Sequence, residues 1–118
     1  MFVYAGGTAR YDIGGSRLGV HRFTTSGTGG GDPVAWCEKL RGRLPFIHLK
    51  DYGFTAANQP VFAEIGAGNL DWPRLIAAAE RAGCEWFIVE QDVCPGDPFD
   101  SLRRSFEYLK TLVSPTGV

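Results

Sequence analysis

The stretch "LPFIHLKD" (residues 44–51) is an apolar run that ends in polar side chains able to do chemistry. His48, Lys50 and Asp51 fall within four positions, directly after residues that are suited to burial. The same arrangement recurs in "EWFIVEQD" (residues 85–92), where the apolar run is followed by Glu90. Two buried strands that each end in polar groups indicate a site at the ends of those strands.

Three helices are expected around these two strands, near residues 33–41, 72–82 and 98–112. Each range follows an aspartate that suits the N-cap position, and each has a proline in its first turn. Apolar residues recur along all three ranges at helical spacing. In the last helix this spacing predicts one apolar face made of Phe99, Leu102, Phe106, Leu109 and Val113.

The order helix, strand, helix, strand, helix predicts an α/β fold with parallel strands near 45–50 and 86–91. Both strands are nearly continuous apolar runs, which is typical of strands covered on both faces. In α/β barrels and in open α/β sheets, active sites are built at the carboxyl ends of parallel strands. The polar residues after each apolar run are therefore placed where this fold class carries its chemistry.

The first 31 residues differ from the rest of the chain, because they hold nine of its sixteen glycines. Short strands are expected at 1–4 and 20–24. We therefore divide the chain into a glycine-rich N-terminal segment, residues 1–31, and a regular α/β part, residues 32–118.

Composition restricts the class of protein. The 118 residues fit one small domain or part of a larger one, and 44% hydrophobic residues are enough for a core. A net charge of −1 argues against a general affinity for nucleic acid or for an anionic membrane. There is no apolar run of ~20 residues and no signal-peptide pattern. Three cysteines without a CxxC spacing are typical of reduced thiols, so a cytoplasmic protein is expected.

Strand alternation identifies the side chains that share a face. His48 shares a face with Lys50, and Glu90 shares a face with Ile88. If these are the inner faces of a barrel, His48 and Glu90 point to the same region. A buried imidazole and a buried carboxylate are costly unless they are paired or bind a cation, and a divalent metal would satisfy both. Alternatively, His48 is a core histidine and Glu90 pairs with Lys50.

The segment "EIGAGNLDW" (residues 64–72) precedes the second expected helix and permits two interpretations. A helix N-terminus at this point could hold a phosphate group. Alternatively, Gly66 and Gly68 turn the chain and Asp71 caps the helix. The glycine spacing differs from the dinucleotide-binding pattern, because the third glycine is absent.

Three motifs together resemble the C-terminal part of sugar phosphate isomerases/epimerases of the xylose isomerase-like TIM-barrel superfamily. They are "GGGDPVAWCEKLRGRLPFIHLKD", "FAEIGAGNLDWPRLIAAAERAGCEWFIVEQD" and "DPFDSLRRSFEYLK", and the resemblance covers about residues 29–113. It implies a partial (β/α) TIM barrel with parallel strands, made of the last three or so βα units. It also implies isomerisation or epimerisation of a small sugar by proton transfer, with a divalent metal (manganese, cobalt or magnesium) held by two glutamates, an aspartate and a histidine.

The resemblance also assigns roles to residues. His48 matches the histidine ligand of the metal, and Glu90 matches a glutamate that is both metal ligand and catalytic acid/base. Lys50 and Asp51 belong to the HLKD motif and are expected to line the substrate site. The other glutamate and the aspartate are expected upstream, yet "GVHRFTTSGT" (residues 19–28) has no carboxylate where the aspartate would lie. Because a complete barrel needs ~250 residues, we expect a fragment that binds metal weakly.

Three hypotheses follow. The first is a partial sugar phosphate isomerase/epimerase that uses metal-assisted proton transfer next to a carbonyl. The second is a non-catalytic half-barrel that associates with itself, as a homo-oligomer, or with a complementary chain. The third is a fragment of a related metal-dependent DNA-repair endonuclease, which the near-neutral charge disfavours.

Overall fold

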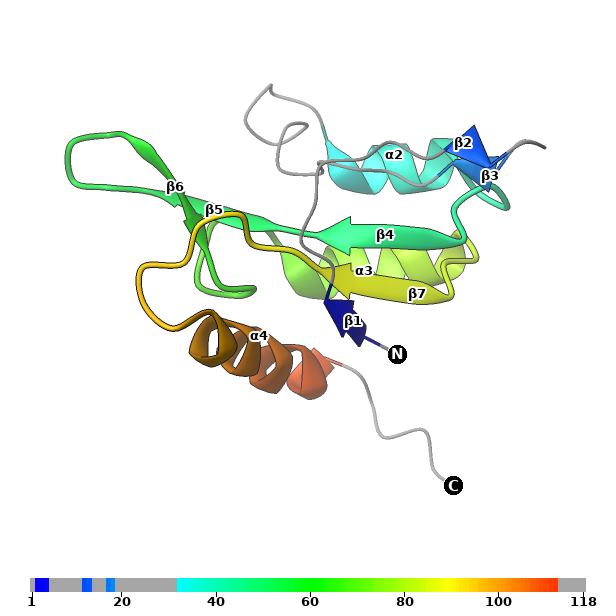
Figure 1. The fold of residues 1–118 in the computed structure, drawn as a ribbon. Coiled ribbons are helices and arrows are strands. Elements are labelled where there is room, and N and C mark those ends of the chain that lie inside the picture. Colours follow the sequence, from blue (N-terminus) through cyan, green and yellow to red (C-terminus); the bar gives the residue numbers. More distant parts are fainter. Residues whose placement is uncertain (1, 5–11, 14–16, 19–31, 113–118) are drawn as a thin grey trace.

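The computed structural model describes residues 2–4, 12–13, 17–18 and 32–112 (Figure 1). In chain order the elements are β1 (Phe2–Tyr4), β2 (Asp12–Ile13), β3 (Arg17–Leu18), α2 (Pro33–Lys39), β4 (Phe46–Leu49), β5 (Asp51–Phe54), β6 (Pro60–Ala63), α3 (Trp72–Arg81), β7 (Trp86–Val89) and α4 (Pro98–Leu112). The result is a mixed α/β structure. The three expected helices are confirmed as α2, α3 and α4, and each lies within two residues of its predicted range.

The central sheet has the strand order β1-β7-β4, and both pairings are parallel. The predicted parallel strands are therefore confirmed, and they are direct neighbours. In this register His48 lies opposite Ile88, so the residues after β4 and β7 emerge at the same edge. The strand expected at 1–4 is confirmed as β1, which pairs with the other side of β7. The strand expected at 20–24 lies outside the described residues.

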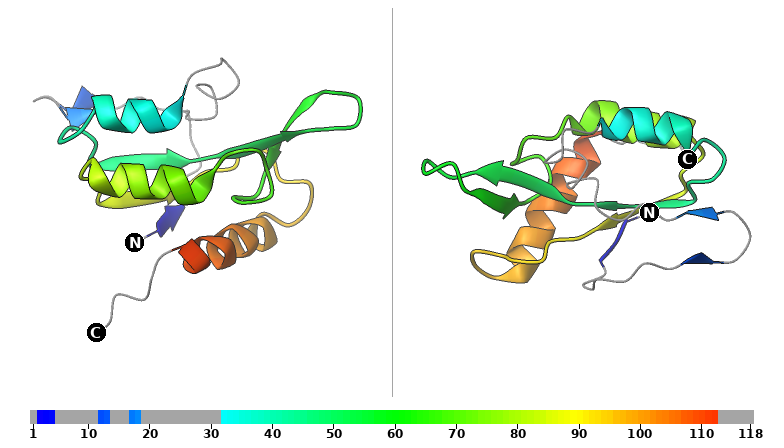
Figure 2. Two further views of the ribbon diagram at one scale, coloured as in Figure 1. Left: turned by 180° about the vertical axis from the view of Figure 1, so that it is seen from behind. Right: turned by 90° about the horizontal axis from the view of Figure 1, so that it is seen from above.

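Strand alternation places the core on one face of this sheet. Ile47 and Leu49 of β4 are fully buried, while His48 between them is only partly buried. β7 alternates in the same way, with Phe87 and Val89 buried. Helices α2 and α3 pack against each other and lie together on one side of β4 (Figure 2). The face that carries His48 and Glu90 is thus opposite the face that packs into the core.

The first turns of α2 and α3 are capped as expected. Asp32 accepts a hydrogen bond from the backbone N–H of Val34 at 2.9 Å. Asp71 accepts one from the N–H of Arg74 at 3.2 Å. Each cap satisfies one of the backbone donors that a helix start leaves without an intrahelical partner. Trp72 follows Asp71 directly and is completely buried. The cap therefore defines the start of α3 at the point where the largest buried side chain packs into the core.

The apolar face predicted for α4 is wrong in part. Phe99 is 79% exposed and Phe106 is 44% exposed, whereas Ser101 and Ser105 are buried together with Leu109. The reason is that α4 docks through hydrogen bonds of its serines to the segment that follows β6, so its contact face includes hydroxyl groups. Val113, which the prediction placed on the same face, lies outside the described residues.

The β5–β6 hairpin is an element that the sequence patterns did not predict. It follows β4 directly and extends beyond the central sheet (Figure 1). Its strands are antiparallel, with Tyr52 opposite Phe62, and its tip contains Asn58 at a positive φ of 58°. None of the helices in the described part of the chain is long and apolar enough to cross a membrane.

Candidate functional site

His48 and Glu90 meet at the carboxyl ends of neighbouring parallel strands. The Nδ1 atom of His48 lies 2.8 Å from the Oε2 atom of Glu90. The Glu90 side chain is almost completely buried, with 1% exposed, and the His48 side chain is 14% exposed. A buried carboxylate is stable only with a compensating partner, and the imidazole is one such partner. The predicted convergence of these two side chains is therefore present in the structure.

Lys50 supplies a second partner for the same carboxylate. Its Nζ atom lies 2.7 Å from Oε1 of Glu90 and 2.8 Å from Oδ2 of Asp92. The lysine itself is only 4% exposed. The pairing of Glu90 with Lys50, which the sequence left open as an alternative to metal binding, is thus present together with the His48–Glu90 contact. One oxygen of Glu90 faces an imidazole and the other faces an ammonium group.

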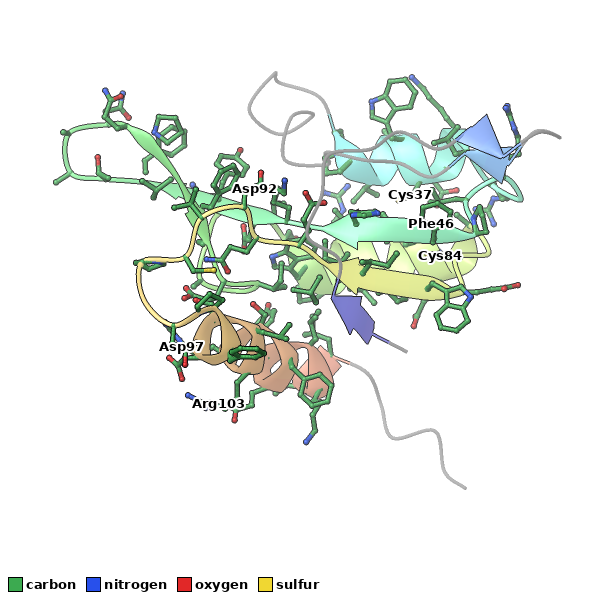
Figure 3. The ribbon with its side chains drawn as sticks, in the orientation of Figure 1. Cys37, Phe46, Cys84, Asp92, Asp97 and Arg103 are labelled. Carbon is green, nitrogen blue, oxygen red and sulfur yellow. The ribbon has the colours of Figure 1, made fainter. Side chains whose placement is uncertain are left out.

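The hairpin contributes one side of this cluster. Nζ of Lys50 lies 5.3 Å from the centre of the Phe62 ring, a distance typical of a cation–π contact. Asp92 lies at the hairpin end of β7, beside the start of β5 (Figure 3). No sequence pattern indicated Phe62 as a site residue, because its position depends on the hairpin register. Asp92 was visible only as a polar residue after an apolar run.

The chemistry of the donor set fits part of a metal site. An imidazole nitrogen and a carboxylate oxygen are ligands that first-row divalent metals accept, and here they converge within hydrogen-bonding distance. Within residues 32–112 and the short strands before them, no group of three or more His, Cys, Asp or Glu side chains could hold a metal ion. His48 and Glu90 are two side chains of suitable ligand chemistry, and the described residues bring no third one to them.

Asp51 lies next to Lys50 in sequence, but its side chain has different surroundings. It is completely buried, and its two oxygens accept hydrogen bonds from five N–H groups. The donors are the backbone N–H groups of Tyr52, Gly66, Gly68 and Leu70 and the indole Nε1–H of Trp72, at 2.7 to 3.4 Å. A carboxylate that accepts this many donors organises the backbone around it.

The donors to Asp51 explain the glycines of "EIGAGNLDW". A Cβ atom at Gly68 would lie 2.3 Å from Oδ1 of Asp51 and 2.3 Å from the Tyr52 carbonyl oxygen. Gly66 has a φ of +89°, and a Cβ atom there would collide with the ring of Tyr108. The turn-and-cap interpretation of this segment is thus confirmed. Its N–H groups do bind an anion, but the anion is the carboxylate of the chain's own Asp51.

The other side of the same segment is held by α4. The Glu64 carboxylate accepts hydrogen bonds from Oγ of Ser101 and Nη1 of Arg104, both at 3.0 Å. The backbone N–H of Ile65 donates to Oγ of Ser105 at 3.0 Å. Burial raises the pKa of the Tyr108 phenol on the same helix, and the nearby Asp51 carboxylate raises it further. The segment 64–72 therefore lies between Asp51 and α4.

Comparison with known proteins supports the fold. No family model matches the chain. The rhizopine catabolism protein MocC of Rhizobium meliloti is 26% identical over a region that covers 75% of this chain and 32% of that protein. A sugar phosphate isomerase/epimerase from Parabacteroides distasonis superposes with a TM-score of 0.57 and 19% identity, covering 84% of this chain and 31% of that one.

The chain therefore spans about a third of the length of each of these relatives. The solved isomerase/epimerase shares its arrangement of parallel strands and helices. The resemblance to sugar phosphate isomerases/epimerases that the sequence motifs carry is confirmed at the level of the fold.

Proposed function

We propose that this chain is part of a sugar phosphate isomerase/epimerase and supplies two metal ligands, His48 and Glu90, to its active site. The observation that carries the proposal is the 2.8 Å approach of His48 Nδ1 to Glu90 Oε2 at the carboxyl ends of two adjacent parallel strands. This edge of a parallel sheet is where α/β enzymes place their chemistry. The two residues are also those that the family resemblance selects.

The proposed architecture is a partial (β/α) TIM barrel. Three parallel strands in the order β1-β7-β4, with α2 and α3 on one side, support it. Alternation along β4 and β7 leaves His48 and Glu90 on the face that does not pack into the core, as the inner face of a barrel requires. In a barrel, strands from the upstream part of the sequence would lie on the side of β4 that faces away from β7. The aspartate and the second glutamate of the metal site are expected on those strands.

The proposed reaction is proton transfer next to the carbonyl group of a sugar or sugar derivative. A divalent cation such as manganese, cobalt or magnesium, when bound, would polarise that carbonyl and make the neighbouring C–H more acidic. Glu90 then removes and returns the proton as a general acid/base. Lys50, held between Glu90 and Asp92, fixes the orientation of the carboxylate and contacts an oxygen of the substrate.

A titration with Mn²⁺, followed by the electron paramagnetic resonance signal of the free ion, tests the metal site. The chain should bind the ion weakly, because two protein ligands leave most of its coordination sphere to water. His48→Ala and Glu90→Gln should each abolish this binding. Asp71→Asn is the matched control, because it changes an exposed carboxylate that caps α3. Unchanged Mn²⁺ binding in both site variants, with their circular dichroism intact, would contradict the proposal.

A second candidate is the non-catalytic half-barrel that associates with itself or with a complementary chain. Large exposed apolar side chains favour it, among them Phe99 at 79% and Val93 at 63% exposure. Light scattering of the purified chain tests this candidate. A homo-oligomer at micromolar concentration that binds no Mn²⁺ would support it, and a monomer that unfolds cooperatively would exclude self-association.

A further inference from the structure

Both oxygens of Asp51 are used as hydrogen-bond acceptors. Its five hydrogen-bond partners in the described part of the chain are all N–H donors, and none of them can accept a proton from it. An asparagine at this position would direct its own NH₂ group at some of these donors. Only one of the two oxygens would then remain an acceptor, and at least two N–H groups would lose their partner. The site is therefore built for a carboxylate and not for an amide of the same shape.

The arrangement around Asp51 is continuous with the His48–Glu90 cluster. Asp51 begins β5 and lies opposite Ala63, the last residue of β6. The residue before Ala63 is Phe62, whose ring contacts Nζ of Lys50. The segment that Asp51 binds follows β6 directly, and the N–H of Asn69 in that segment also donates to the Tyr52 carbonyl at 2.8 Å. Holding this segment in place therefore also holds the end of β6.

We propose that Asp51 is the positioning residue of the site, and that it acts by holding the 64–72 segment so that Phe62 confines Lys50 against Glu90. The proposal rests on the proposed function in taking Lys50 and Glu90 as the reacting cluster. It gives Asp51 a role without contact between its carboxylate and the substrate, which agrees with its complete burial. Phe62, 37% exposed, becomes the part of the hairpin that borders the substrate space.

Nuclear magnetic resonance of the labelled full chain tests this role without metal or turnover. Asp51→Asn should shift the N–H signals of Gly66 and Gly68 and the indole N–H signal of Trp72, because each loses its carboxylate acceptor. It should also abolish the nuclear Overhauser effects between Lys50 and the Phe62 ring. Asp32→Asn, which changes the exposed cap of α2 outside this segment, is the control and should leave both groups of signals unchanged. A variant that shifts only the 64–72 signals and keeps the Lys50–Phe62 effects would overturn the proposal.

Two further variants keep the proposal testable if Asp51→Asn does not fold. Trp72→Phe removes one donor to Asp51 and keeps an aromatic ring in the core, so it should weaken the Lys50–Phe62 effects in the same direction. Phe62→Leu should remove the ring-current shift of Lys50 while Gly66 and Gly68 keep their signals. If Trp72→Phe shifts the glycine signals and leaves the Lys50–Phe62 effects at full strength, Asp51 has only a local role. Because the readout is structural, a failed Mn²⁺ titration would leave this result interpretable.

Discussion

Glu90 has the most demanding electrostatic position among the residues of the site. Its carboxylate is 1% exposed and is contacted by His48 on one oxygen and by Lys50 on the other. An ion pair in such a position contributes little net stability, but removing one partner leaves a buried charge without compensation. This asymmetry makes the cluster sensitive to single substitutions, whatever chemistry it performs.

Lys50→Met is expected to destabilise the protein by about 3–5 kcal/mol, the range for breaking a buried ion pair from one side. The free energy of unfolding from urea denaturation, followed by circular dichroism, measures this loss. Arg103→Met is the control. Arg103 lies on the side of α4 that faces away from the sheet and forms exposed ion pairs with Asp100 and Glu107 (Figure 3). Equal unfolding midpoints for the two variants would show that Lys50 does not compensate Glu90.

The three cysteines are expected to differ in reactivity. Burial raises the pKa of Cys37 and of Cys84 to about 11, so both stay protonated at neutral pH, and the thiolate is the reactive form. Cys94 is only partly buried. A thiol reagent at pH 7.5 should therefore modify Cys94 quickly and the other two only in denaturant. Cys94→Ser should remove the fast phase, and a fast phase that persists in this variant would contradict the burial of Cys37 and Cys84.

Residues whose surroundings follow from strand alternation could be predicted from the sequence. His48 and Glu90 share a face because side chains alternate along a strand, and that rule holds for any strand. The surroundings of Asp51 could not be predicted in this way. Four of its five donors come from residues 66–72, and their approach depends on the exact turn of a loop. Because Lys50 and Asp51 are adjacent in the HLKD motif, both were expected to line the substrate site. In the structure, Lys50 contacts Glu90 and Asp51 contacts the 64–72 segment.

The segment 64–72 connects three parts of the structure: β5, α3 and α4. It receives the carboxylate of Asp51 on one side and the serines and Arg104 of α4 on the other. It also leads directly into the capped start of α3. The carboxylate of Asp51 and the carbonyl oxygen of Tyr52 lie so close to the backbone at Gly68 that a side chain has no room there.

Gly68→Ala is therefore expected to cost about 1–3 kcal/mol or more, the range for forcing extra volume into a packed site. The added Cβ atom would meet Oδ1 of Asp51, which two N–H donors hold in place, and the backbone carbonyl oxygen of Tyr52. Gly53→Ala is the matched control, because nothing lies within 4 Å of a Cβ atom at that position in β5. Urea denaturation should give a lower midpoint for Gly68→Ala alone. A midpoint that drops equally in Gly53→Ala would contradict the explanation.

Elements with strong local signals were predicted well. Aspartate caps and helical spacing located α2, α3 and α4, and apolar runs located β4 and β7. The β5–β6 hairpin was missed because its strands contain glycine and proline and do not alternate clearly between apolar and polar residues. The buried face of α4 was predicted wrongly because periodicity counts apolar residues, whereas this helix docks through Ser101 and Ser105.

The strand order β1-β7-β4 defines the central sheet of the molecule. β7 lies between two parallel neighbours, and the polar residues after β4 and β7 emerge at one edge of the sheet. The chain spans about a third of the length of its relatives. Under the proposed function, this third carries one side of a metal site and the hairpin that borders it. An experiment that shows where Mn²⁺ binds on the chain therefore tests the proposed metal site more strongly than a measurement of its affinity.

Paramagnetic broadening by Mn²⁺ in the nuclear magnetic resonance spectrum of the full chain locates the ion directly. At substoichiometric Mn²⁺, the ring signals of His48 and the side-chain signals of Glu90 should broaden first, followed by those of Lys50 and Phe62. Exposed carboxylates on α4, such as Glu107, provide the internal comparison for adventitious binding. If the α4 carboxylates broaden at the same or lower Mn²⁺ concentration than His48 and Glu90, the two residues do not form part of a metal site.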